Sequence, residues 1–177
     1  MTLNIKKNYN NIIRPDLILK KKYKNIMEIP KIKKIVLNIT INSKNKIIEP
    51  LMILELITGQ KAIILKAKKS ISSFGIRKNQ YIACKTTLNK ENMYNFLNKL
   101  IHIVLPRIRD LKALPVSSMD GKGNYTLPIS NIIVFPEIEY QLNILNKIYG
   151  MDITIVTTAK TNFEAELLLS NLQLPLK

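Results

Sequence analysis

Apolar and polar positions alternate along much of the chain, and this alternation is clearest in "KIKKIVLNITI" at residues 31–41. A period of two predicts a β-strand with one buried face. Two β-branched-rich segments, "KAIILKA" at 61–67 and "QYIACKTTL" at 80–88, flank a polar stretch and predict two strands joined by a long tip. "SNIIVF" at 130–135 and "MDITIVTTA" at 151–159 predict two more strands.

A helical period marks residues 91–106, where Asn89 can cap the start and Pro106 ends the pattern. The apolar stripe of this helix consists of Met93, Phe96, Leu97, Leu100, Ile101 and Val104. Three further helices are predicted at 14–25, 45–59 and 161–175. Their end signals are Pro15, Pro50 in a first turn, Gly59, and the capping-box spacing of Thr161 and Glu164.

The order of predicted elements is helix, strand, helix, strand, strand, helix, strand, strand, helix, with a long connection of little periodicity at 107–128. No linker, repeat or break in composition interrupts it. We therefore expect one domain over residues 1–177, of the α+β class: a mostly antiparallel sheet with helices on one face. The other face is then free to hold a ligand, as in sheet-based RNA readers.

Charge narrows the choice of partner. The 177 residues carry 28 Lys and Arg against 12 Asp and Glu, a net charge of +16, while 46% of residues are hydrophobic. This sequence can form a folded core, and a polyanionic partner, either nucleic acid or an anionic membrane, would relieve its charge repulsion, although some small proteins are simply basic. The cations are spread over helix, strand and loop, and no apolar run approaches the roughly 20 residues of a membrane span. We expect a soluble protein with a nucleic acid, rather than a membrane, as its partner.

The densest positive charge lies in "KAKKSISSFGIRKNQ", residues 66–80, which we call the basic loop. No acid lies between Glu55 and Glu91 to neutralise it, so we expect the loop to project, and to stay mobile until a partner orders it. Most cations of the chain are Lys, which binds phosphate as a point charge and reads base edges poorly. The lysines predicted to contact phosphate are Lys20, Lys21, Lys22, Lys66, Lys68 and Lys69.

The sequence contains few of the residue types and spacings that catalysis and metal binding require. Cys84 and His102 are the only residues of their kinds, and "GKGNY" lacks the spacing of a phosphate-binding loop. Four acids keep open the alternative of a metal-dependent nuclease: Asp110, Asp120, Glu137 and Glu139. Their spacing matches no metal motif, so we expect no enzyme, no metal and no cofactor.

Six segments in order resemble one family, the bacterial-type ribosomal protein five of the large subunit, which binds 5S rRNA. They are "IPKIKKIVLNI" (29–39), "ITGQKAIILKAKKS" (57–70), "FGIRKNQYIACKTTL" (74–88), "LPRIRDLKAL" (105–114), "DGKGNYTLPISNIIVFPEI" (120–138) and "GMDITIVTTAKT" (150–161).

The resemblance implies an α+β fold and a structural role in the central protuberance of the large subunit, beside other ribosomal proteins. It implies binding to 5S rRNA, to large-subunit rRNA or to both, and contact with the small-subunit head. It places Asn38, Gln60 and Thr87 together on the exposed sheet face against rRNA. It also brings the loop between the central strands to peptidyl-site tRNA, through Ser70, Ser72, Ser73, Gly75, Arg77, Lys78, Asn79 and Gln80.

The abundance of Ile, Asn and Lys, whose codons are A/T-rich, indicates an organelle genome. We expect an organellar ribosome, the mitochondrion ahead of the plastid or a bacterial cytoplasm. A non-ribosomal RNA-binding protein remains the first alternative and the nuclease the second.

Overall fold

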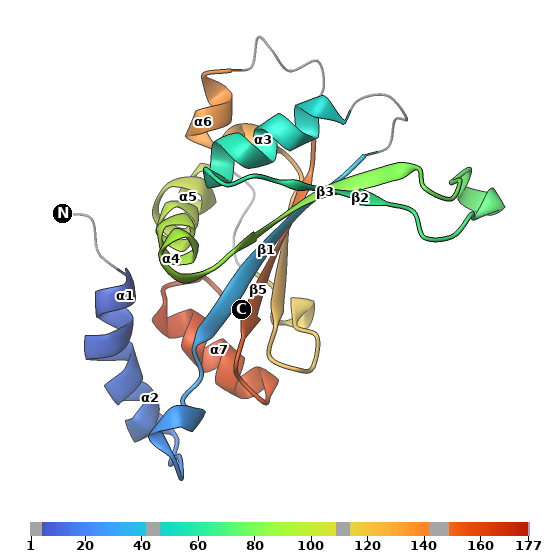
Figure 1. Ribbon diagram of the computed structural model, residues 1–177. Helices are drawn as coiled ribbons and strands as arrows, with labels where there is room; N and C mark the ends of the chain where they lie inside the picture. Colours follow the sequence, from blue (N-terminus) through green and yellow to red (C-terminus); the bar gives the residue numbers. More distant parts are fainter. Residues whose placement is uncertain (1–4, 42–46, 109–113, 142–148, 177) are drawn as a thin grey trace. The chain divides into compact units, whose positions relative to one another are not determined.

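The computed structural model describes residues 5–41, 47–108, 114–141 and 149–176 (Figure 1). Its strands are β1 (Ile32–Thr40), β2 (Ile63–Lys66), β3 (Tyr81–Leu88), β4 (Tyr125–Ile129) and β5 (Met151–Thr157). Its α-helices are α1 (Ile5–Asn8), α2 (Arg14–Lys20), α3 (Ile48–Thr58), α4 (Lys90–Lys99), α5 (Leu105–Arg107), α6 (Pro136–Glu139) and α7 (Asn162–Asn171). None of these helices is both long and apolar enough to cross a membrane.

The five strands form one antiparallel sheet in the order β2-β3-β1-β5-β4, which confirms the α+β class. At one edge, β2 pairs only with β3, with Ile63 opposite Lys85 and Ile64 opposite Cys84. The strands predicted at 31–41, 61–67, 80–88 and 151–159 are confirmed as β1, β2, β3 and β5.

Burial follows the predicted alternation. In β1, Ile35, Leu37 and Ile39 are buried, whereas Val36 and Asn38 between them are half-exposed. The same pattern runs through β5 and through β3 from Cys84 to Leu88, with Ala83 buried as well. Each of these strands therefore packs one side into a core and leaves the other side open.

By its internal contacts the chain divides into two compact units. Unit 1 comprises residues 1–35, 88–127 and 154–177, and unit 2 comprises residues 36–87 and 128–153. That the whole chain acts as a single domain stays a prediction.

The predicted helix at 91–106 belongs to unit 1 and is confirmed, running as α4, a π-helical turn and α5. All six residues of its predicted apolar stripe are buried. Asn89 precedes α4 as expected, but its side chain makes no capping hydrogen bond. The helix observed in place of the predicted one at 14–25 is shorter, because α2 ends at Lys20. Residues 5–13 are also helical, which the sequence pattern does not predict.

The predicted strand at 130–135 is wrong. The structure has a 3₁₀ turn at Ile132–Val134 followed by α6, because the Asn131 side chain accepts a hydrogen bond from the Ile133 amide and Pro136 begins a helix. A strand lies just before, at β4, within the stretch read as a connection. Pro128 argues against a strand in the sequence, but β4 is an edge strand, where proline is tolerated.

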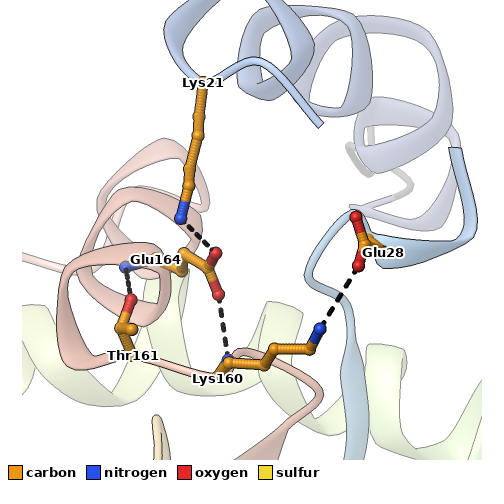
Figure 2. Close-up of polar contacts among 5 residues, drawn as sticks. All are labelled: Lys21, Glu28, Lys160, Thr161 and Glu164. Atoms are coloured by element: carbon orange, nitrogen blue, oxygen red, sulfur yellow. Dashed lines mark hydrogen bonds and ion pairs between the residues drawn. The ribbon is translucent and has the colours of Figure 1, made fainter. Parts of the chain in front are cut away.

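In unit 1, the start of α7 is tied to the segment that contains α2 (Figure 2). The Thr161 side chain caps α7 by accepting a hydrogen bond from the Glu164 amide, as the capping-box spacing predicts. The buried Glu164 carboxylate accepts a hydrogen bond from the Lys160 amide and forms an ion pair with Lys21. Lys160 in turn pairs with Glu28 at 3.2 Å. We call these contacts the α2–α7 clasp.

Candidate nucleic-acid interface

The basic loop joins β2 to β3 in unit 2 (Figure 1). It has a framework of backbone hydrogen bonds of its own. At its base, the Ala67 amide donates to the Gln80 carbonyl at 2.8 Å, and the Asn79 amide donates to the Ala67 carbonyl at 2.9 Å. Near its tip, Ile71 and Ile76 exchange two backbone hydrogen bonds of 2.9 and 3.1 Å. These bonds give the loop the form of a hairpin; that it stays mobile until a partner orders it remains a prediction.

Two of the polar side chains predicted to face tRNA brace this hairpin. The Ser70 hydroxyl accepts a hydrogen bond from the Lys78 amide at 2.9 Å, and the Gln80 side-chain carbonyl accepts one from the Arg77 amide at 3.0 Å. Arg77 and Lys78 themselves are exposed. Ser70 and Gln80 thus hold the backbone from which two cationic side chains extend into solvent.

The other predicted loop residues form the turns. Ser72 and Ser73 belong to a 3₁₀ turn that ends at Gly75, whose amide donates to the Ser72 carbonyl at 3.0 Å. Gly75 and Asn79 have positive φ angles of 63° and 64°. All four residues are exposed.

The lysines at the start of the loop differ in their surroundings. The Lys66 ammonium lies over the Tyr81 ring, 5.3 Å from its centroid, while Lys68 and Lys69 are exposed. No acidic residue occurs in the sequence from 56 to 90, so the loop carries no negative charge of its own. A positively charged, narrow projection of this kind suits a polyanion.

Asn38 and Thr87 lie on the open side of neighbouring strands β1 and β3, each half-exposed between two buried residues. Gln60 is exposed in the turn between α3 and β2, outside the strands. Its backbone amide donates a hydrogen bond to the Thr58 hydroxyl at 3.2 Å. The structure therefore brings two of the three residues to one sheet face and leaves Gln60 off it. Contact of these residues with rRNA stays a prediction.

Two of the three N-terminal lysines have acidic partners in unit 1. Lys20 lies 2.8 Å from Asp16, and Lys21 forms the ion pair with Glu164. The hydrogen bond to Glu164 raises the pKa of Lys21. Burial alone would raise the pKa of Glu164, but hydrogen bonds from Lys21 and the Lys160 amide outweigh it and leave that pKa below its ordinary value. Lys22 is exposed. The i,i+4 spacing of Asp16 and Lys20 could have been noticed in the sequence; the Glu164 partnership could not.

The acids considered for a nuclease do not form a metal site within the part of the chain that the structure describes. The Asp120 carboxylate accepts hydrogen bonds from the Asn124 side chain and from the Lys122 and Asn124 amides, which lower its pKa. Glu137 and Glu139 belong to unit 2, and Asp110 lies outside the described residues. Within the described ranges, no three His, Cys, Asp or Glu side chains gather closely enough to hold a metal ion.

Comparison with known proteins decides the family. Residues 25–77 match the family described as Ribosomal protein L5, and residues 81–176 match the model for the C-terminus of the same ribosomal family. The chain belongs to the ribosomal protein L5 family. It is 51% identical over 176 residues to large ribosomal subunit protein uL5m of Reclinomonas americana, covering 97% of each chain. It is 47% identical over 180 residues to uL5 of Limosilactobacillus reuteri, covering 99% of this chain and 98% of the relative. This is a family of structural ribosomal proteins and not of enzymes, so the nuclease alternative is wrong.

Proposed function

We propose that this chain is a structural component of the large ribosomal subunit and binds rRNA through its basic surfaces. The observation that carries the proposal is the hydrogen-bonded basic loop without acids, in a chain of net charge +16 that belongs to the ribosomal protein L5 family. Relatives that match along nearly their whole length are named large ribosomal subunit proteins.

The finer assignment follows from the resemblance of the six sequence segments. The chain joins 5S rRNA to large-subunit rRNA in the central protuberance, beside other proteins, and contacts the small-subunit head. Asn38 and Thr87 meet rRNA from the open sheet face, and the basic loop meets peptidyl-site tRNA. The similarity to a uL5m protein and the A/T-rich coding composition support a mitochondrial ribosome.

The manner of binding follows from the residue types. A ribosome must accept every tRNA at the peptidyl site, so the loop is required to contact what tRNAs share. Exposed Lys68, Lys69, Arg77 and Lys78 offer charge to phosphates, which are common to all tRNAs. Phosphate contacts position an RNA without reading its sequence.

Salt dependence tests the electrostatic part of the proposal. Changing Lys68 and Lys69 to Gln removes two phosphate contacts, so the slope of log affinity against log salt should flatten by roughly 1.4–1.8 for single-stranded to duplex RNA. Affinity would be measured by filter binding over a series of KCl concentrations. A matched control changes Lys6 and Lys160, which already pair with Glu91 and Glu28, and removes the same charge. An equal effect of both double variants would refute a specific role for the loop.

Trimming the loop tests the tRNA assignment. A short Gly-containing turn in place of residues 70–81 should leave assembly into the large subunit nearly intact, because the pairing of β2 with β3 from Ile63 opposite Lys85 to Leu65 opposite Ala83 lies outside the trimmed segment. The same change should weaken tRNA retention at the peptidyl site. Sedimentation reports assembly and also separates a ribosomal role from an RNA-binding role elsewhere. If the trimmed chain no longer enters the subunit, the loop anchors assembly and the tRNA assignment is wrong.

A further inference from the structure

An aromatic side chain stands at the tip of the basic loop. Phe74 is 76% exposed, and Ile71, three residues before it, is 44% exposed. Of the other phenylalanines, Phe96 and Phe135 are buried and Phe163 on α7 is 61% exposed. Keeping a phenylalanine in water forgoes a hydrophobic gain of about 1.5–3 kcal/mol. A tip that served only to carry charge would have no use for this side chain.

The backbone presents Phe74 in a fixed way. It is the last residue of the 3₁₀ turn, which is closed by the Gly75 amide on the Ser72 carbonyl. The paired Ile71 and Ile76 close the hairpin immediately below. A phenylalanine has only two side-chain torsions to fix, and here its backbone lies in a hydrogen-bonded turn. Binding through this ring therefore costs little conformational entropy.

The surroundings of Phe74 indicate what covers it. The nearby charges in sequence are Lys68, Lys69, Arg77 and Lys78, and the loop has no acid, so charge complementarity requires an anionic partner. Among anionic partners, RNA also offers flat aromatic faces. In a duplex these faces are stacked on one another, but the bases of loops, bulges and single strands are free to stack on a protein ring.

We propose that Phe74 stacks on an unpaired nucleobase of the RNA that the basic loop binds. This inference rests on the proposed function of the loop and adds a second, uncharged component to it. The lysines and Arg77 supply an attraction that falls with salt, and Phe74 supplies a contact that does not. Because every base has an aromatic face, such a contact selects RNA with an unpaired base and tolerates any sequence.

The test compares two RNAs with equal numbers of phosphates: a hairpin with an unpaired loop, and a blunt duplex. Phe74→Ala should weaken binding of the purified chain to the hairpin by about 5- to 140-fold, the factor that corresponds to about 1–3 kcal/mol of stacking per base. Affinity for the duplex should stay unchanged, and so should the salt slope for both RNAs. Phe74→Tyr should bind the hairpin like the original chain, and Phe74→Leu should bind like the alanine variant.

Several results would overturn the proposal. If Phe74→Ala loses affinity equally for the hairpin and the duplex, or for neither, Phe74 does not stack on a base. Its exposed ring would then make an apolar contact with a protein. Full binding by Phe74→Leu shows that an apolar group suffices without a ring. Since Phe74 is exposed, unchanged circular dichroism is expected for all variants. An Arg77→Gln/Lys78→Gln variant tests the proposed function separately: if it changes neither affinity nor salt slope, the electrostatic role fails whatever Phe74 does.

Discussion

The turn at Gly121 and Gly123 allows a steric contact to be separated from backbone strain. Both glycines have φ of 80°, a left-handed conformation, but their surroundings differ. A Cβ added at Gly121 would meet nothing within 4 Å. A Cβ added at Gly123 would lie 2.9 Å from both the Cβ and the carbonyl oxygen of Ala159. Alanine substitution therefore imposes the same backbone cost at both positions and a collision at only one.

The magnitudes follow from these distances. Left-handed backbone costs a residue with a Cβ about 1–2 kcal/mol, which is the whole loss expected for Gly121→Ala. The collision at Gly123 is with backbone and with the buried Ala159, neither of which can swing away, so overpacking adds about 1–3 kcal/mol. Relief by shifting the turn is opposed by the Thr157 hydroxyl, which donates to the Gly123 carbonyl at 2.7 Å. The total for Gly123→Ala is roughly 2–5 kcal/mol.

Urea and thermal unfolding of the two purified variants would measure this difference. The chain has no Trp, so far-UV circular dichroism is the suitable signal. An extra 1–3 kcal/mol corresponds to a melting temperature lower by about 2–12 °C in Gly123→Ala than in Gly121→Ala, at about 2–4 °C per kcal/mol for a chain of this size. Losses equal within about 0.5 kcal/mol would refute the collision.

Two further predictions concern buried polar groups. Because the pKa of Glu164 is lowered on folding, its contribution to stability is present above its ordinary pKa of 4.5 and is lost as pH falls through the lower folded value. The difference in melting temperature between the original chain and Glu164→Gln should therefore shrink on acidification, and a difference that is constant with pH contradicts this role. The buried Thr86 hydroxyl has no hydrogen-bond partner among the described residues, so Thr86→Val should stabilise by about 1 kcal/mol. Thr157→Val, which removes bonds to the Gly123 carbonyl and the Ala159 amide, should cost about 1–3 kcal/mol; equal effects of both in urea unfolding would contradict the prediction.

The sequence was a good guide wherever a local period decided the structure. The alternation around Leu37 and the stripe around Leu97 predicted the buried faces of β1 and α4 correctly, because burial of one face is what produces such periods. It failed at residues 130–135, where an apolar run looked like a strand but Asn131 offered the backbone a local hydrogen bond instead.

The candidate site was harder to predict, because composition does not report hydrogen bonds between distant residues. The cluster of lysines around Lys68 and Lys69 located the basic loop. It did not indicate that the Ser70 and Gln80 side chains brace the backbone or that Phe74 stands exposed. Nor did the run of three lysines at Lys20 reveal that partners on α7 engage it, since those partners follow more than 140 residues later.

The α2–α7 clasp has a consequence for how the protein is made. Lys21 and Glu164 are separated by 143 residues, and translation at about 5–20 residues per second puts roughly 7–29 s between their syntheses. During that interval Lys21, directly after α2, has no acidic partner, in the crowded RNA environment of the translating ribosome. Unit 1 cannot close until its last chain segment, which begins at Thr154, has been synthesised. Folding of unit 1 is therefore late and depends on contacts between distant parts of the sequence. A nascent chain stalled before α7 would expose a basic helix that can bind any nearby RNA.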